Sequence, residues 1–491
     1  MTNPSLERVA RALDAAAVLV ERRGALPDEI RAVTDDSRRV APGTLFVAVR
    51  GTERDGHDYL EAAERAGAAA AIVEDASRTT LPALVVRDAR RAAAIAAASV
   101  YGEPARGLTM LAVTGTNGKT TTVGLLRHLF DHPDARSASV GTLGVLLGSE
   151  GTEVPGGGGL TTPGPVELQR LLRTLADQHV ETVAMEVSSH SLDQRRVEGV
   201  RYDAAIFTNL TRDHLDYHGS MERYFAAKAQ LVSQLAPDGV AVVNADDDAW
   251  KDLPLSPRRV TFGMTAANAD VRALDVRFGP RGSEFTLAAG AESAPVRLPL
   301  IGDFNVANAL GAAAAAWALE IPLDAVAERL SRAPQVPGRL ELIHERPTVL
   351  RDYAHTPDAL ERALDAVRPF ARQRLIVVFG CGGDRDRGKR PLMGGIAEAK
   401  ADLAVVTSDN PRTEDPSGIL DDIESGMTRG RHERVEDRRD AIARALALAG
   451  DEDVILLAGK GHETYQIRGT TKLPFDEREI VHELAAEAGR A

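Results

Sequence analysis

The chain has 491 residues, 27% of them charged and 44% hydrophobic, and a formal net charge of −13 at pH 7. This length exceeds what one hydrophobic core serves and predicts about three domains of an ordinary globular protein. The acidic balance argues against a nucleic acid as the main partner, because phosphate backbones bind basic surfaces. It leaves open a local basic pocket for a small anion.

The sequence also indicates a compartment. Its single cysteine, Cys381, cannot form an intramolecular disulfide, and its apolar and glycine neighbours predict a buried position at the end of a strand. The N-terminal residues lack the charged-then-apolar pattern of a signal peptide. The longest apolar stretch, 310–319, is far shorter than the about 18 residues that cross a bilayer. We therefore expect a cytoplasmic protein without membrane contact.

Short apolar strands alternate with helical segments from the N-terminus onward. Strands are predicted at 44–49 and 69–73, and residues 103–107 are expected to form a linker. The alternation continues over 108–335, which is typical of a mostly parallel sheet with helices on both faces. The strands predicted there are 182–185, 204–207 and 240–243.

A second break at 334–338, rich in proline and glycine, separates a last α/β region of the dinucleotide-fold type. Its predicted strands are 348–351, 375–379, 403–407 and 454–458. The sequence thus predicts an α/β protein of three domains, at 1–107, 108–335 and 336–491.

The most informative stretch is 111–121, where an apolar strand runs into a glycine-bearing loop and then into a helix over 123–130. Glycines at 115 and 118 let backbone N–H groups approach an anion, and the helix N-terminus favours negative charge. Lys119 can reach the outer phosphates, and the hydroxyl of Thr120 can ligate the magnesium that accompanies a nucleoside triphosphate. The pattern predicts a site for ATP or GTP.

Polar residues follow other strands, where open α/β sheets bind their ligands. Glu186 is placed to supply a second magnesium ligand, and His214 lies in a polar run after the strand that ends at Phe207. Lys228 lies on a predicted helix among small and apolar residues, where desolvation would lower its pKa and permit carbamate formation. Helical periodicity alone favours the simpler interpretation of an exposed lysine.

Three runs in the last region mix guanidinium and carboxylate groups, at 382–390, 408–412 and 459–463. Each follows an apolar strand, so all three are expected at one rim of the sheet. Such a mixture suits a zwitterionic amino acid, because arginine pairs with carboxylates and acidic side chains pair with ammonium groups.

Taken together, 115–120, 186–190 and 409–412 resemble the Mur ligase family, whose members use ATP to form amide bonds in the peptide of bacterial peptidoglycan. The resemblance covers essentially the whole chain. It implies an N-terminal uridine-nucleotide-binding module, a central ATP-binding domain, a C-terminal amino-acid-binding domain, and hinge motion near 334–338. The implied substrates are ATP, UDP-N-acetylmuramoyl-L-Ala-D-Glu and meso-2,6-diaminopimelate, with Mg²⁺ as cofactor.

The resemblance also assigns roles to individual residues. Catalysis would fall to Lys119, Lys228, Glu186 and His214. One magnesium ion would be held by Thr120 and Glu186. A second would be held or oriented by His214 and by Lys228 carbamylated to N6-carboxylysine. ATP binding is assigned to Gly115, Thr116, Asn117, Gly118, Lys119, Thr120, Thr121, Asn305, Asn308, Arg339 and Asp352. The UDP-muramoyl-dipeptide is assigned to Ser37, Thr161, Thr162, Ser188, Gln194 and Arg196. Diaminopimelate is assigned to Arg385, Asp409, Asn410, Pro411, Arg412, Gly459 and Glu463.

The run 409–412 resembles the signature of family members that add meso-diaminopimelate, whereas lysine-adding members lack its arginine. Arg412 would pair with the second carboxylate, which lysine does not have, and would be left as an unpaired charge in a lysine site. Leu160 departs from the pattern, since some relatives carry asparagine there, and it removes one polar contact to the dipeptide.

Three alternatives stay open at this point. A lysine-adding ligase of the same family would not depend on Arg412 for its choice of amino acid. A folate polyglutamate ligase would share the phosphate loop but not 36–38 or 409–412. A nucleotide-hydrolysing switch protein would have no use for the cluster of Arg385, Arg412 and Glu463.

Overall fold

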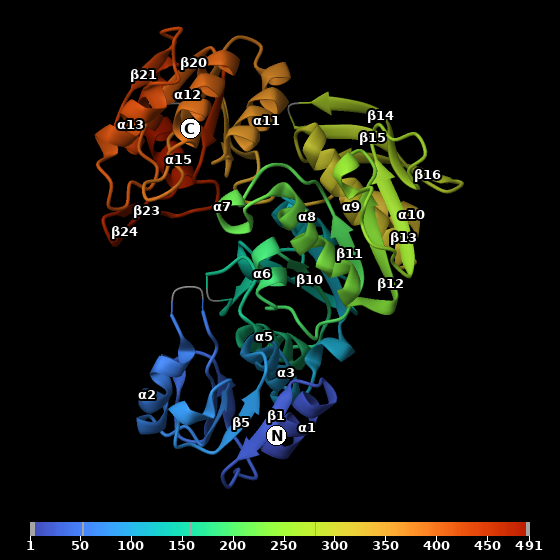
Figure 1. The fold of residues 1–491 in the computed structure, drawn as a ribbon. Helices are drawn as coiled ribbons and strands as arrows, with labels where there is room; N and C mark the ends of the chain where they lie inside the picture. The colour runs from blue at the N-terminus through green and yellow to red at the C-terminus, as the bar shows by residue number, and fades with distance from the viewer. Residues whose placement is uncertain (1–4, 52–53, 158, 280, 488–491) are drawn as a thin grey trace. The chain divides into compact units, whose positions relative to one another are not determined.

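A computed structural model describes residues 5–51, 54–157, 159–279 and 281–487. They form two compact units. Figure 1 shows their helices and strands, coloured from the N-terminus to the C-terminus. The first comprises Met1–Arg272, Ala288–Glu292 and Asn308–Arg329, and the second comprises Ala273–Leu287, Ser293–Ala307 and Leu330–Ala491. The predicted three-domain boundaries at 107/108 and 335/336 stay a prediction.

The first unit begins with a five-stranded sheet of order β1-β5-β4-β3-β2, in which only β1 runs antiparallel to its neighbour. The strands are β1 (Leu19–Arg23), β2 (Ala32–Thr34), β3 (Thr44–Val47), β4 (Ala70–Val73) and β5 (Ala83–Val86). The helices are α1 (Leu6–Ala15), α2 (Leu60–Arg65) and α3 (Ala89–Val100). The strands predicted at 44–49 and 69–73 are therefore confirmed as β3 and β4. The predicted linker at 103–107 contains a 3-10 turn, η4 (Pro104–Gly107), in which Pro104 is buried, and its role as a domain boundary stays a prediction.

The second sheet of this unit has the order β14-β13-β12-β11-β6-β10-β7-β8-β9, and only β8 and β9 run antiparallel to their neighbours. Its strands are β6 (Thr109–Thr114), β7 (Arg136–Gly141), β8 (Gly144–Leu147), β9 (Thr152–Val154), β10 (Val180–Glu186), β11 (Tyr202–Phe207), β12 (Leu235–Asn244), β13 (Arg258–Gly263) and the start of β14 (Val271–Gly279). The predicted mostly parallel sheet is confirmed.

Helices α4 (Lys119–Phe130) and α5 (Pro165–Asp177) both contact β10. Leucines of α5 join residues of β6, β7 and β10 in one hydrophobic cluster. The other helices are α6 (Ser189–Asp193), α7 (Leu215–His218), α8 (Met221–Ala229), α10 (Leu323–Leu330) and α9 (Asp303–Ala318), which continues into the second unit. The predicted helix at 123–130 is confirmed and starts earlier, at Lys119. The loop that contains Gly158 lies partly outside the described residues.

The second unit is built on a six-stranded sheet of order β17-β18-β22-β19-β20-β21, parallel except for β17. The strands are β17 (Glu341–Glu345), β18 (Thr348–Asp352), β19 (Leu375–Phe379), β20 (Leu403–Val406), β21 (His432–Arg434) and β22 (Val454–Ala458). A separate hairpin pairs β23 (Tyr465–Arg468) with β24 (Thr471–Pro474). The unit also contains β15 (Gly282–Ala289) and β16 (Glu292–Leu298), whose turn belongs to the first unit.

Alternate residues of β19 face two different hydrophobic clusters, which confirms helices on both faces of this sheet. One cluster includes residues of α11 (Pro357–Val367), α12 (Lys389–Lys400) and α13 (Pro416–Glu424). The other includes residues of α14 (Arg438–Leu448) and α15 (Glu477–Glu487). Cys381 follows β19 and is buried as predicted, and this burial raises the pKa of its thiol to about 12. In the described part of the chain, no helix is long and apolar enough to cross a membrane.

Candidate active site

The phosphate loop connects the end of β6 to the start of α4. Gly115 has φ +147° and Gly118 has φ +85°, backbone conformations that side chains disfavour. A Cβ atom at Gly115 would collide with Oγ1 of Thr208, and one at Gly118 would collide with Oδ1 of Asn308. The loop therefore requires glycine at both positions, and it leads directly into the N-terminus of α4, where backbone N–H groups can bind an anion.

A second loop, which follows β11 and contains Asn209, is hydrogen-bonded to the phosphate loop. The backbone N–H of Thr116 donates to the carbonyl of Asn209 at 2.7 Å, and that of Asn117 donates to Oδ1 of Asn209 at 2.9 Å. The side chain of Lys119 folds back over its own loop, where Nζ donates to the carbonyls of Gly115 at 2.9 Å and Thr116 at 2.8 Å. The lysine predicted to reach the outer phosphates is thus held against the backbone of the phosphate loop by these two hydrogen bonds.

Lys228 lies on α8 and is only 1% exposed, so the exposed lysine favoured by periodicity is wrong. Its Nζ donates to the carbonyl of Gly115 at 2.8 Å and lies 4.6 Å from the ring centroid of Tyr224. Burial, together with the charge of Lys119, lowers the pKa of Lys228 well below its ordinary value. The sequence reasoning missed Tyr224, whose hydroxyl lies 3.2 Å from Oγ1 of Thr116. Its position four residues before Lys228, on the same face of the helix, was the available signal.

Glu186 ends β10 and is 1% exposed. Its carboxylate accepts hydrogen bonds from the backbone N–H of Thr142 at 2.8 Å and from the hydroxyl of Thr142 at 3.2 Å. The Thr142 hydroxyl also lies 3.1 Å from that of Thr161, which places the predicted metal ligand beside the predicted dipeptide site. Sequence reasoning missed Thr142 because no motif surrounds it.

The predicted dipeptide residues form a connected cluster around Thr162, with one exception. The Thr162 hydroxyl donates to the carbonyl of Glu186 at 2.9 Å and accepts from the N–H of Ser188 at 3.2 Å. Arg196 donates to the carbonyl of Thr162 at 3.1 Å and to Oε1 of Gln194 at 2.6 Å. The exception is Ser37, which starts the 3-10 turn η1 (Ser37–Arg39) and shares no described hydrogen bond with this cluster.

His214 follows β11 in a left-handed conformation with φ +53°, and its side chain is 47% exposed. Its ring meets that of His190 edge-on, with 4.7 Å between the centroids. Partial burial lowers the pKa of His214, although Asp213 opposes the shift. Among the described residues, no group of three or more His, Cys, Asp or Glu side chains forms a metal site by itself.

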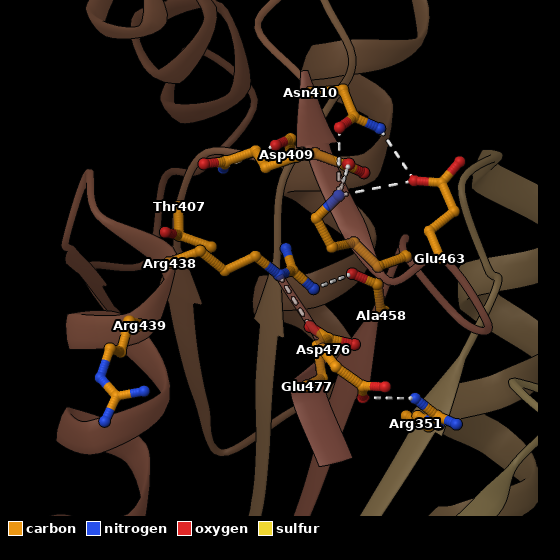
Figure 2. A network of polar contacts seen from close by, with 12 residues as sticks. Arg351, Thr407, Asp409, Asn410, Arg438, Arg439, Ala458, Glu463, Asp476 and Glu477 are labelled. Atoms are coloured by element: carbon orange, nitrogen blue, oxygen red, sulfur yellow. Dashed lines mark hydrogen bonds and ion pairs between the residues drawn. The ribbon is translucent and has the colours of Figure 1, made fainter. Parts of the chain in front are cut away.

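The second unit carries the predicted amino-acid residues at the carboxyl ends of its central strands. Asp409 and Asn410 follow β20 and are 6% and 5% exposed. The amide of Asn410 faces the carboxylate of Glu463, and Nδ2 donates to Oε2 at 2.9 Å (Figure 2). Gly459 has φ +114°, and its missing Cβ leaves room for the carboxylate of Asp409. These four residues lie together although up to 54 positions separate them, 463 − 409.

Arg412 lies at the edge of this cluster in a left-handed conformation with φ +51°. Its Nη1 donates to the carbonyl of Gly383 at 2.7 Å, and its backbone N–H donates to the carbonyl of Ile467 at 3.1 Å. Pro411 beside it is buried. Arg385 belongs to the loop that starts at Gly382, is exposed, and donates to the carbonyl of Asp384 at 2.9 Å. Both predicted guanidinium groups therefore border the 382–385 loop.

The remaining predicted nucleotide residues divide between the units. Asn308 lies against Gly118 in the first unit, whereas Asn305 lies in the second and donates to the carbonyl of Ile301 at 2.8 Å. Asp352 ends β18 and accepts from the N–H of Leu340 at 2.7 Å. Burial raises the pKa of Asp352 to about 6, while the positive charge of Arg339 opposes the rise.

Comparison with known families gives matches along most of the chain. Residues 29–107 match "Mur ligase family, catalytic domain", residues 113–316 match "Mur ligase middle domain", and residues 338–461 match "Mur ligase, glutamate ligase domain".

Curated relatives match over nearly the full length. A protein of Geobacillus kaustophilus is 44% identical over 479 residues, which cover 95% of this chain and 96% of the relative. A protein of Synechococcus elongatus is 45% identical over 487 residues, covering 96% and 97%. Both carry the name UDP-N-acetylmuramoyl-L-alanyl-D-glutamate--2,6-diaminopimelate ligase.

Solved structures have the same fold. A structure titled as that same ligase has a TM-score of 0.69 and 34% identity, covering 96% of this chain and 98% of its own. A folylpolyglutamate synthase of Mycobacterium tuberculosis, complexed with ADP and AMPPCP, has a TM-score of 0.63 at 20% identity, covering 75% and 92%, and is similar in fold alone.

Proposed function

This chain belongs to the Mur ligase family, and from that premise we propose that it joins meso-2,6-diaminopimelate to the D-glutamate γ-carboxylate of UDP-N-acetylmuramoyl-L-Ala-D-Glu, using ATP. The main support for this proposal is the near-full-length similarity to relatives that bear the name of this ligase. The activity belongs to peptidoglycan precursor synthesis in the cytoplasm.

The phosphate loop and Lys119 support the nucleotide part of the proposal. The backbone N–H groups at the start of α4 would accept the phosphates, and the Lys119 ammonium would leave the carbonyls of Gly115 and Thr116 for the transferring phosphoryl group. Asn308, Arg339 and Asp352 are proposed to hold the rest of the nucleotide.

The proposed magnesium site fits the residues present. Thr120 and Glu186 offer a hydroxyl and a buried carboxylate, and His214 offers an imidazole. Lys228, desolvated and with a lowered pKa, is suited to carbamylation, which would turn a cation into a carboxylate ligand. A carbamate retains one N–H, so the hydrogen bond to Gly115 can persist. The oxygen ligands among these, from Thr120, Glu186 and the carbamate, together with nucleotide phosphates, are usual for Mg²⁺, which would offset the charge of the phosphoryl group.

The second cluster supports the choice of amino acid. Arg412 and Arg385 are proposed to pair with the carboxylate that diaminopimelate has and lysine lacks. Asp409 and Glu463 are proposed to receive its ammonium group. Removing water from these pairs strengthens their discrimination, because an amino acid without the second carboxylate would leave a guanidinium unpaired.

In the proposed reaction the γ-carboxylate of D-glutamate attacks the γ-phosphorus of ATP, and ADP leaves. An amine of diaminopimelate then attacks the acyl phosphate, the amine loses its proton, and phosphate leaves as the amide bond forms. Thr162, Ser188, Gln194 and Arg196, joined by their own hydrogen bonds, would hold the dipeptide in place for both attacks.

Phosphate release tests the proposal directly, with ATP, Mg²⁺ and the UDP-muramoyl-dipeptide present and meso-diaminopimelate or L-lysine offered in parallel. Release with diaminopimelate and little with lysine is expected. A preference for lysine would keep the family and overturn the role of the pocket. Release that ignores both amino acids would indicate a nucleotide-hydrolysing switch instead.

A further inference from the structure

Lys460 lies next to the proposed amino-acid pocket, yet no role has been assigned to it above. It follows β22 between two glycines with positive φ, Gly459 at +114° and Gly461 at +55°. This turn directs the side chain inward, and Lys460 is 0% exposed. A fully buried lysine requires compensating partners, because an isolated ammonium is costly in a low-dielectric interior.

The partners of Lys460 are the pocket residues themselves. Its Nζ donates to the carbonyl of Tyr465 at 2.8 Å and to Oδ1 of Asn410 at 3.1 Å. It also lies 3.5 Å from Oε2 of Glu463 and 3.5 Å from Oδ1 of Asp409. One cation thus touches three of the residues proposed to bind the amino acid, and two of the three are carboxylates.

These contacts determine which way the amide of Asn410 faces. Its Oδ1 accepts from Lys460 and from the backbone N–H of Ile467 at 2.9 Å, so Nδ2 is left to donate to Glu463. Asn410 and Lys460 both contact Oε2 of Glu463, and the side chain of Tyr465 also hydrogen-bonds the Glu463 carboxylate. These contacts together fix the orientation of the Glu463 carboxylate, and Lys460 contributes the positive charge among them.

We infer that Lys460 is a positioning residue of the amino-acid pocket: its buried ammonium orients Asn410 and Glu463, and Glu463 in turn receives the ammonium of diaminopimelate. The inference rests on the proposed function, because it assigns Glu463 to that amino acid. It predicts that removing the Lys460 charge weakens amino-acid binding selectively, since the nucleotide residues make no described contact with Lys460.

The test is Lys460→Met, which keeps the length of the side chain and removes its charge. We expect the KM for meso-diaminopimelate to rise about tenfold and the KM for ATP to stay within about twofold. Lys472→Met is the matched control, because Lys472 is exposed on β24. Its Nζ lies 4.1 Å from the ring centroid of Tyr465 and has no described contact with Asp409, Asn410 or Glu463. A KM, unlike kcat, does not change when part of the protein misfolds.

A double-mutant cycle separates positioning from a general structural role. If Lys460 acts through Glu463, then Lys460→Met added to Glu463→Gln should raise the KM for diaminopimelate by no more than about twofold further. Additive effects, or equal rises in the KM values of ATP and diaminopimelate, would overturn the inference.

Lys460→Gln, which keeps N–H donors without the charge, replaces Lys460→Met if the methionine variant does not fold. Failure of both variants to fold would assign Lys460 to the fold alone. Wild-type protein without diaminopimelate-dependent turnover would instead overturn the proposed function.

Discussion

The two site regions each contain a buried lysine, and the surroundings of these lysines are opposite. Lys228 in the first unit is 1% exposed, and its described contacts are the carbonyl of Gly115 and the ring of Tyr224. Lys460 in the second unit is 0% exposed and has two carboxylates within 3.5 Å. The same residue type is thus buried once with no ion pair among the described residues and once in a network that compensates its charge.

The difference explains what each lysine is suited to do. Burial without a close counter-ion lowers the pKa of Lys228 and favours the neutral, nucleophilic amine that carbamylation requires. A compensated ammonium is suited to holding neighbouring groups in fixed orientations, and its removal leaves like charges facing each other. The comparison therefore predicts a chemical role for Lys228 and an organising role for Lys460.

Lys228→Ala should have the largest effect, because it removes the group proposed to become a metal ligand at the phosphoryl-transfer site. We expect kcat to fall about 1000-fold or more, with partial recovery on addition of short-chain carboxylates that replace the carbamate. Steady-state phosphate release measures both. Lys251→Ala, an exposed lysine of the same unit, is the control and should keep wild-type turnover. Full activity of Lys228→Ala without additives would remove the carbamate from the proposal.

Arg412→Ala should have the next largest effect, and it should act on binding rather than on turnover. We expect the KM for diaminopimelate to rise about 100-fold and that for ATP to stay unchanged, since a charged partner of one substrate is lost. Because Arg412 has φ +51°, Arg412→Gly is a useful second variant that removes the guanidinium and relaxes the backbone. Equal KM values in the two variants would assign the effect to the side chain.

Arg439→Ala is the matched control for Arg412, since Arg439 lies on α14 and pairs with Glu483 at 2.9 Å. It should leave both KM values at their wild-type level. Equal changes in the KM values of diaminopimelate and ATP on Arg412→Ala would place Arg412 outside the amino-acid pocket.

The phosphate loop could be predicted from the sequence because strand, glycines, lysine and helix are consecutive there. The burial of Lys228 could not, because helical periodicity does not report that the loop after β6 contacts this face of α8. Only the resemblance to a family corrected that interpretation. Tyr224 has a contact with Thr116 from another element that helical spacing alone does not report, and Thr142, which contacts Glu186, has no motif around it.

In the second unit, four of the six strands of the main sheet were predicted, and so were the three polar runs at one edge of that sheet. The direction of individual side chains was not predictable, because it depends on local backbone conformation. Lys460 points inward because glycines with positive φ flank it, and nothing in the run 459–463 distinguishes this from an exposed lysine. In the N-terminal sheet of the first unit, the short strands β1, β2 and β5 were not predicted, because their burial patterns carry little periodicity.

Two glycine substitutions should act on different substrates and so sharpen the comparison between the regions. Gly118→Ala would press its Cβ against Oδ1 of Asn308, and Gly459→Ala would place its Cβ 2.7 Å from Oδ2 of Asp409. We expect the first to raise the KM for ATP and the second the KM for diaminopimelate, each about tenfold. Gly430→Ala has a similar positive φ but open space around the new methyl group, so it reports backbone strain alone. Effects on both substrates from either site variant would contradict the separation of the two regions.

The smallest predicted effect concerns the pH dependence of stability next to the amino-acid pocket. Burial lowers the pKa of His462 from 6.5 to about 4, and the charges of Arg339 and Arg351 add to the shift. As the pH falls below 6.5, the unfolded chain takes up a proton at this histidine that the folded chain does not, so stability is lost between pH 6.5 and about 4.

His462→Gln cannot take up this proton in either state. Between about pH 7 and pH 5 the variant should therefore lose about 2 kcal/mol less stability than the wild type, or about 2 °C less in Tm. Thermal unfolding at the two pH values measures this difference. An identical loss of stability in both proteins would mean that groups other than His462 take up the proton. The surroundings of Lys228 and Lys460 would then still differ in charge compensation, but not in the cost of protonating a buried side chain.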